Sequence, residues 1–127
     1  VSWFRTNGVT SCHYIVGDAG EIVQMVPDNR AAMHCGSKKE RGWNDRSIGI
    51  EHAGYVDDGK PPTGACLKSS ALITAIMCRK FGIPVDRAHI IGHVEVPGAT
   101  HTDPGKEWPW DRYMEMVKAA YSKTLEE

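Results

Sequence analysis

The stretch ACLKSSALITAIMCRKFG (65–82) constrains the fold most strongly, because its apolar residues recur every three to four positions, as one face of an α-helix requires. Gly82 closes this stretch and Pro84 follows it, a combination typical of a helix end. Residues 110–127 show the same spacing, with Tyr113 on the apolar face. A helix with one apolar face must bury that face, so both helices predict another layer beside them.

Short runs rich in β-branched and aromatic residues predict that this other layer is a sheet. HYIVG (13–17) and EIVQMV (21–26) are separated by GDAG, a spacing typical of a β-hairpin. SIGIEHAGY (47–55) predicts a third strand, and AHIIGH (88–93) predicts a fourth one after the helix. We therefore expect an α/β fold, with helices packed on a central sheet, in a single domain of residues 1–127.

Charge and hydropathy argue against two classes of partner. The chain has 15 Lys and Arg against 16 Asp and Glu, so its formal net charge of −1 favours neither nucleic acid nor an anionic membrane. The longest apolar run, ALITAIMC (71–78), is far too short to span a bilayer. The sequence opens on VSWFRTNG without a signal-peptide pattern, and we expect a monomer with no membrane span and no nucleic-acid partner.

The four cysteines, Cys12, Cys35, Cys66 and Cys78, allow three disulfide pairings, and none of them forms the CxxC pair of a structural zinc knuckle. Cys66 and Cys78 lie on the same predicted helix, about 18 Å apart along its axis, so they cannot bond each other. We expect buried free thiols at these two positions. The cysteines do not decide between an oxidising and a reducing compartment for this protein.

The segment GHVEVPGATHTDPG (92–105) carries the first candidate site. A catalytic zinc takes three protein ligands from His, Asp, Glu or Cys, and the loop between His93 and Asp103 can fold both onto one ion. His101 lies close to this pair and can donate a hydrogen bond to a developing oxyanion or move a proton. The alternatives are a core histidine at 93, a turn and helix cap at Asp103, and a surface histidine at 101.

Glu51 is the second candidate, because it ends the apolar run SIGIE, where a carboxylate is costly to bury unless its charge is used or paired. A carboxyl group whose pKa is raised by burial suits a general base; the alternative is a strand-end residue in solvent. The polar stretch 27–47 predicts a long loop, and such loops in compact domains are usually functional or mobile. His34 in this loop either lines a cleft or serves the structure alone.

Four segments, in this order along the chain, resemble the type-2 N-acetylmuramoyl-L-alanine amidases, the family that includes the peptidoglycan recognition proteins and phage lysozyme-type amidases. They are SCHYIVGDAGEIVQMVPDNRAAMHCG (11–36), NDRSIGIEHAGY (44–55), RKFGIPVDRAHIIGH (79–93) and HVEVPGATHTDPGKEWPWDRY (93–113). The resemblance implies an α/β fold with a central mixed β-sheet flanked by helices. It also implies a zinc-dependent hydrolase that cleaves the amide between N-acetylmuramic acid and L-alanine in peptidoglycan.

The same resemblance implies a role for each candidate residue. His93 and Asp103 match two zinc ligands of the family, and Glu51 matches its general base. His101 matches a position, often lysine in relatives, that stabilises the oxyanion. His34 matches the histidine of a loop that lines the cleft without binding zinc.

The family's first zinc ligand, a histidine on an initial strand followed by a helix, has no match, because SWF (2–4) already predicts the end of that helix. Three explanations stay open. A segment ahead of Val1 carries the histidine, or His13 or His52 has replaced it, or the domain is a zinc-free module that only binds peptidoglycan.

The implied partner is peptidoglycan or a muropeptide, held in an open cleft with one wall formed by His34, Trp43 and Asn44. The implied place of action is the cell wall, reached by secretion, in the periplasm, or as a phage endolysin released from the cytoplasm. Lysis by an endolysin or autolysin and recycling of soluble muropeptides both stay open.

Overall fold

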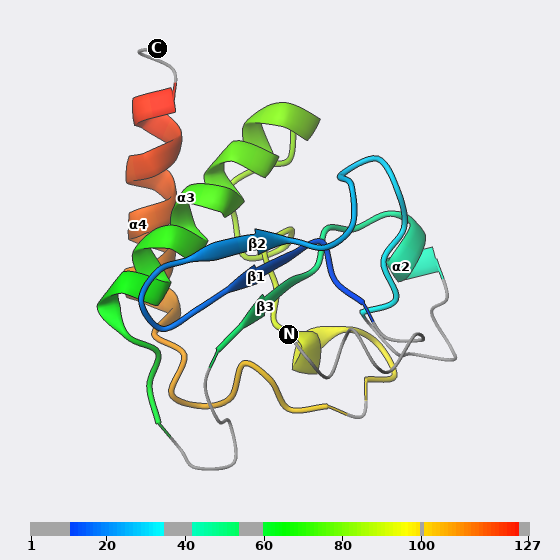
Figure 1. Ribbon diagram of the computed structural model, residues 1–127, viewed down its shortest axis with the longest axis horizontal. Helices are drawn as coiled ribbons and strands as arrows, with labels where there is room; N and C mark the ends of the chain where they lie inside the picture. The colour runs from blue at the N-terminus through cyan, green and yellow to red at the C-terminus, as the bar shows by residue number, and fades with distance from the viewer. Residues whose placement is uncertain (1–10, 35–41, 54–59, 100, 125–127) are drawn as a thin grey trace.

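The computed structural model describes residues 11–34, 42–53, 60–99 and 101–124 (Figure 1). Within these ranges the chain forms a small sheet, two long helices and two short helical turns. In chain order the elements are β1 (Tyr14–Val16), β2 (Ile22–Gln24), α2 (Gly42–Asp45), β3 (Ile50–His52), α3 (Gly64–Phe81), the 3₁₀ turn η2 (His93–Glu95) and α4 (Trp110–Thr124).

The sheet has the strand order β2-β1-β3 among the described residues and is mixed. β1 and β2 form the predicted antiparallel hairpin, whereas β1 and β3 run parallel, with Ile15 opposite Glu51 and Val16 opposite His52. Successive side chains of a strand point to opposite faces. His52 therefore points to the face that α3 covers, while Ile15 and Glu51 point to the other face.

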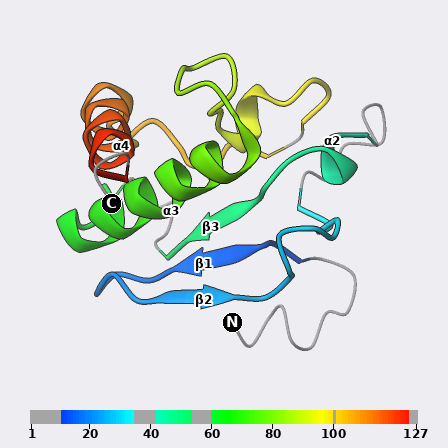
Figure 2. The same ribbon diagram turned by 90° about the horizontal axis from the view of Figure 1, so that it is seen from above.

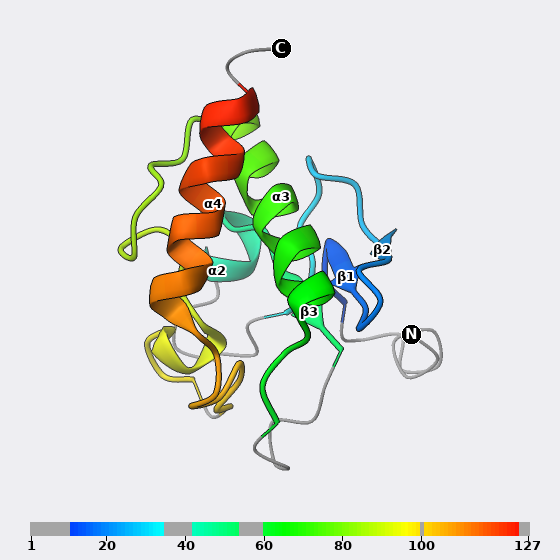
Figure 3. The same cartoon turned by 90° about the vertical axis from the view of Figure 1, so that its left-hand side faces the viewer.

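The two predicted helices are confirmed: both ends of α3 lie within one residue of the expected ones, and α4 begins at the expected Trp110. The Thr63 side chain caps α3 by accepting a hydrogen bond from the Cys66 N–H, and the helix stops at Gly82, whose φ of 65° favours glycine. Figures 2 and 3 show α3 lying between the sheet and α4. The core between the two helices comprises Leu67, Ala71, Ala75, Trp108, Tyr113, Met114 and Val117.

The predicted strand at 88–93 is wrong, because this segment folds into turns and ends at the start of η2. The Asp86 carboxylate accepts hydrogen bonds from the Ala88 and His89 N–H groups, and the Arg87 side chain binds the Ile90 carbonyl. These local bonds satisfy backbone groups that a strand would pair across a sheet. The expected strand–helix–strand order of the second half is therefore not formed.

Two other expectations have mixed outcomes. The predicted loop 27–47 contains the short helix α2. Of the described part of the predicted strand 47–55, only β3 is a strand, and residues 54–55 lie outside the described residues. The predicted helix end at 2–4 lies outside the described residues.

The prediction of buried free thiols is confirmed for Cys66 and Cys78, and Cys12, for which no state was predicted, is also free and buried. Burial raises the pKa of the Cys12 and Cys66 thiols to about 11, so neither is a thiolate at neutral pH. Cys35 lies outside the described residues. Among the helices of the described part of the chain, none has the length and apolar character needed to cross a membrane.

A chain of polar side chains ties β3 to both long helices. The His52 Nε2 lies 2.6 Å from the Ser70 hydroxyl, which lies 2.8 Å from the Tyr113 hydroxyl, and Thr74 also bonds Tyr113 at 2.7 Å. The His52 ring packs against Trp108 with 4.5 Å between ring centroids. Burial lowers the pKa of His52 to about 4, so the ring is neutral at pH 7. This neutral imidazole anchors β3 to the helical layers.

The low pKa of His52 makes stability depend on pH. Between pH 6.5 and about 4 the unfolded chain binds a proton at His52 that the folded protein does not, so the free energy of unfolding falls as pH falls. His52→Gln keeps a hydrogen-bonding group for Ser70 but cannot titrate. We expect thermal unfolding from pH 7.5 to 4.5 to show a clearly smaller loss of Tm in this variant than in the wild type. Equal losses would contradict the assignment.

Candidate functional site

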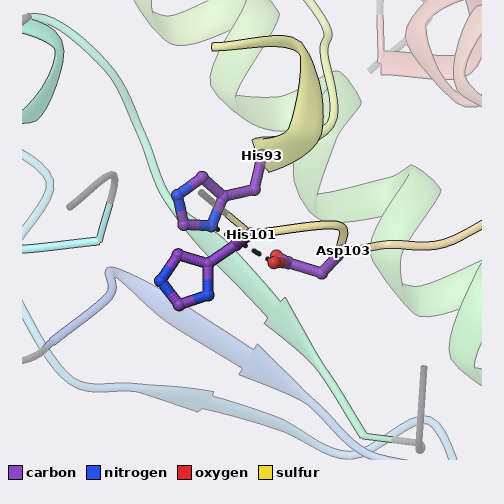
Figure 4. A group of neighbouring side chains, drawn as sticks. All are labelled: His93, His101 and Asp103. Atoms are coloured by element: carbon purple, nitrogen blue, oxygen red, sulfur yellow. Dashed lines mark ion pairs between the residues drawn. The ribbon is translucent and has the colours of Figure 1, made fainter. Parts of the chain in front are cut away.

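The turn η2 and the loop that follows it bring His93, His101 and Asp103 together. One potential ligand atom from each residue lies within 4.8 Å of those of the other two, and Figure 4 shows the side chains converging. The His93 Nδ1 lies 3.3 Å from Asp103 Oδ1, and the His93 and His101 rings stack with centroids 4.7 Å apart. We call these three residues the His–Asp cluster.

Close backbone packing sets the position of this cluster. Gly92 is buried directly before His93, and a Cβ at this position would lie 2.6 Å from Pro104 Cδ. The Val94 N–H donates to the Asp103 carbonyl at 3.0 Å, which ties η2 to the second half of the loop. Sequence reasoning missed Gly92, although a glycine directly before a candidate ligand was the available signal.

Asp103 supplies a negative charge beside two imidazoles. Burial acts to raise the pKa of Asp103, but the hydrogen bond and charge of His93 outweigh burial and hold that pKa below its ordinary value. An ionised carboxylate with imidazole nitrogens is a donor set that suits a zinc ion. The residues present therefore fit a divalent metal.

Glu51 projects from β3 toward the same region. Its side chain keeps a solvent-exposed side, but protein surrounds it elsewhere, and this burial together with the charge of Asp103 raises its pKa to about 7. His93 acts in the opposite direction. Glu51 also borders a hollow of about 340 Å³ on the face of the sheet opposite α3. The lining residues are Ile15, Gly17, Glu21, Val23, Glu51, His52 and Ala53.

The loop expected to form a cleft wall is held together by its own side chains. Asn44 Oδ1 accepts a hydrogen bond from the His34 N–H at 3.0 Å, and the His34 Nε2 lies 3.2 Å from the Ser47 hydroxyl. Ser47 in turn donates to the Trp43 carbonyl. Burial, helped by His13 and His93, lowers the pKa of His34 to about 4. The structure thus brings His34, Trp43 and Asn44 together and keeps the imidazole neutral.

One of the three open explanations, in which His13 or His52 replaces the missing metal ligand, does not fit the structure. The Gly49 N–H donates to His13 Nδ1 at 3.0 Å, so the ring proton is on Nε2, which donates to the Arg30 carbonyl at 2.7 Å. Both His13 nitrogens are therefore occupied by the backbone. His52 points to the other face of the sheet and bonds Ser70.

A carboxyl group with a raised pKa beside a His–Asp donor set is typical of metal-dependent hydrolases. The particular family follows from the sequence: the chain belongs to the N-acetylmuramoyl-L-alanine amidase family, whose model matches residues 2–106. The resemblance to this family and the α/β fold with a mixed sheet are both confirmed.

Curated relatives and solved structures agree with this membership. The chain is 32% identical over 109 residues to the 1,6-anhydro-N-acetylmuramyl-L-alanine amidase AmpD of Enterobacter cloacae, covering 84% of this chain and 56% of the relative. For AmpD of Escherichia coli K12 the identity is 33% over 110 residues, covering 84% and 58%. The chain thus spans less than two thirds of the length of these relatives.

Two solved structures share the fold. A crystal structure of a selenomethionine derivative of AmpD superimposes with a TM-score of 0.75 at 32% identity, covering 85% of this chain and 60% of that one. The E. coli amidase AmiD, in complex with anhydro-N-acetylmuramic acid-L-Ala-D-γ-Glu-L-Lys, superimposes with a TM-score of 0.71 at 22% identity, covering 85% and 48%. The second likeness supports the fold alone.

The packing of Gly92 can be tested with one methyl group. In Gly92→Ala the new Cβ meets the rigid Pro104 ring, so we expect a loss of about 1–3 kcal/mol in the free energy of unfolding. Displacement of Asp103 from His93 should also weaken the binding of a divalent metal to the His–Asp cluster, measured by competition with a chelator. The matched control is Gly64→Ala, where the new Cβ meets nothing within 4 Å, so neither quantity should fall. Equal behaviour of the two variants would refute the steric argument.

Proposed function

We propose that this chain carries the catalytic domain of a zinc-dependent amidase that hydrolyses the bond between N-acetylmuramic acid and L-alanine. The observation that carries the proposal is the pair of carboxyl groups with opposite pKa shifts, Asp103 lowered and Glu51 raised to about 7, beside the imidazole of His93. Environments that separate two carboxyl groups in this way assign one to a charged role and the other to proton transfer. Family membership supports the same activity.

In this proposal His93 and Asp103 hold the zinc ion. The donor set of nitrogen and anionic oxygen is the one that zinc prefers, and the two side chains already face each other. When bound, zinc supplies a Lewis acid that favours ionisation of water and polarises the substrate carbonyl. The third protein ligand is either His101 or a residue outside the described part of the chain.

Glu51 acts as general base and then as general acid. It accepts a proton from the water whose oxygen attacks the lactyl carbonyl carbon, and it passes the proton to the nitrogen of L-alanine as the C–N bond breaks. Burial raises the pKa of this carboxyl group in the metal-free protein, and a carboxyl group with a raised pKa suits both transfers, because it must take up and release one proton in each turnover. If the third zinc ligand lies elsewhere, His101 donates a hydrogen bond to the oxyanion of the tetrahedral intermediate.

The wall formed by His34, Trp43 and Asn44 contacts the substrate beside this centre. The neutral His34 ring and the Trp43 indole offer apolar and stacking surface for a sugar, while the backbone bond to Asn44 fixes the loop. The names of the curated relatives favour a soluble 1,6-anhydro-muropeptide as the substrate, rather than the intact wall that an endolysin or autolysin cleaves.

The proposed function is tested with zinc-loaded full-length protein and its Glu51→Gln variant. We expect the wild type to bind about one zinc per chain and to release stem peptide with a free L-alanine amine from an anhydro-muropeptide, faster than from intact sacculi. Loss of the base should lower kcat by roughly 10²–10⁴-fold while zinc content and Tm stay unchanged. Binding of either substrate without release of peptide would instead identify a recognition module.

His101 is assigned by comparing His101→Ala with His101→Lys. If the ring serves the oxyanion, alanine should lower kcat by about 10²–10³-fold at unchanged zinc content, and lysine should restore most of the rate, since an ammonium also donates. If lysine instead loses zinc together with activity, His101 is the third ligand and the oxyanion assignment is wrong. Zinc per chain and kcat are measured on the same preparations.

A further inference from the structure

An ion pair outside the His–Asp cluster connects to the backbone on both sides of His93. Arg87 Nη2 lies 2.9 Å from Glu95 Oε1, and both side chains are partly open to solvent, with 38% and 39% exposed. The same Glu95 oxygen accepts the Gly92 N–H at 2.8 Å. Since Gly92 directly precedes His93 and Glu95 closes the turn η2 two residues after it, this carboxylate joins the chain before the candidate ligand to the chain after it.

Arg87 is itself anchored to the helical core. Its guanidinium lies 3.5 Å from the centre of the Trp110 ring at the start of α4, and Nη1 donates to the Ile90 carbonyl at 2.6 Å. Planar stacking and several fixed N–H donors are properties of arginine that lysine lacks. Arg87 is therefore held against α4, and it holds the Glu95 side chain in place beside η2.

The other side of η2 is tied to the second ligand. The Val94 N–H donates to the Asp103 carbonyl at 3.0 Å, and Gly92 packs against Pro104. A shift of η2 therefore changes the separation of the His93 and Asp103 side chains. Metal ligation tolerates such a shift poorly, because bond lengths and directions are narrow.

We propose that Arg87 and Glu95 are positioning residues that hold His93 in the orientation required for metal binding. This inference rests on the proposed function, because it takes His93 to be a metal ligand. A positioning role predicts that removing the pair changes zinc affinity without changing Tm, whereas a merely structural role predicts that both fall together. A half-exposed ion pair contributes little to global stability, so its loss in Glu95→Gln, which keeps an acceptor for the Gly92 N–H, should leave Tm nearly unchanged while zinc affinity falls.

The test measures the zinc dissociation constant of the full-length protein by chelator competition, together with Tm. In Glu95→Ala we expect zinc affinity to fall by about 10-fold to 100-fold, the range found for residues that orient metal ligands. Arg87→Ala should act in the same direction, and the double variant should be no weaker than Glu95→Ala, because both changes break one connection.

The matched control is His89→Gln, which removes the nearby ion pair between His89 and Asp86. That pair has similar exposure, 48% and 50%, and a short distance of 2.6 Å, but the hydrogen bonds of Asp86 to His89 and to the backbone stay within the turn at 84–90. We expect wild-type zinc affinity in this variant. Glu95→Gln provides a second test, because its amide oxygen can still accept the Gly92 N–H while the charge for Arg87 is lost, and its affinity should be intermediate.

Each result separates the inference from the function on which it rests. Wild-type zinc affinity in Glu95→Ala and Arg87→Ala overturns the positioning role and leaves the proposed amidase intact. A loss of zinc affinity that is proportional to a loss of Tm, or an equal loss of affinity in His89→Gln, also overturns the positioning role. A wild-type protein that binds no zinc overturns the proposed function and this inference together. If Glu95→Ala does not fold, Glu95→Gln and Arg87→Ala decide.

Discussion

The alternation of side chains along β3 is the constraint on which the site depends. Glu51 and His52 are neighbours in sequence, and a strand must send them to opposite faces of the sheet. His52 is held on the helical side by Ser70 and Trp108, so Glu51 has to face the His–Asp cluster. A slip of one residue in the pairing with β1 would exchange the two side chains. It would place a carboxylate against the core and remove the proton acceptor from the site.

Electrostatics then divides the roles of the two carboxyl groups. Asp103 lies beside His93, which stabilises its charged form, whereas Glu51 is partly desolvated and feels the negative charge of Asp103. Two like charges in one site cannot both be held at ordinary pKa values, and the better-paired group keeps its charge. A cation bound between His93 and Asp103 would weaken the effect of Asp103 and lower the pKa of Glu51. The site thus couples metal binding to proton affinity.

Sequence reasoning succeeded where local patterns decide the structure. The apolar spacing of 65–82, the stop at Gly82 and the hairpin signal between 13 and 26 each depend on residues close in the chain, and all three are present in the fold. The predicted strand at 88–93 was wrong, because a short apolar run is equally compatible with a strand and with a turn packed on helices. Its turn is fixed by Asp86 and Arg87, whose hydrogen bonds a pattern of apolar residues does not reveal.

The histidines show the limit of such reasoning most clearly. Any histidine can in principle bind a metal, and only the groups that its ring nitrogens contact in the fold show which role it has. His13 bonds Arg30 and Gly49, which are 17 and 36 positions away in the chain, so nothing in its neighbourhood marks it as structural. Gly49 is needed there because the His34 ring lies against it, where a Cβ would approach the ring carbon Cγ to 2.5 Å. The same glycine therefore binds one histidine through its N–H and makes room for another. Both ring nitrogens of His13 bond backbone groups, and the His34 ring is neutral at pH 7. Neither ring therefore adds a positive charge that would oppose a cation binding beside the Asp103 carboxylate.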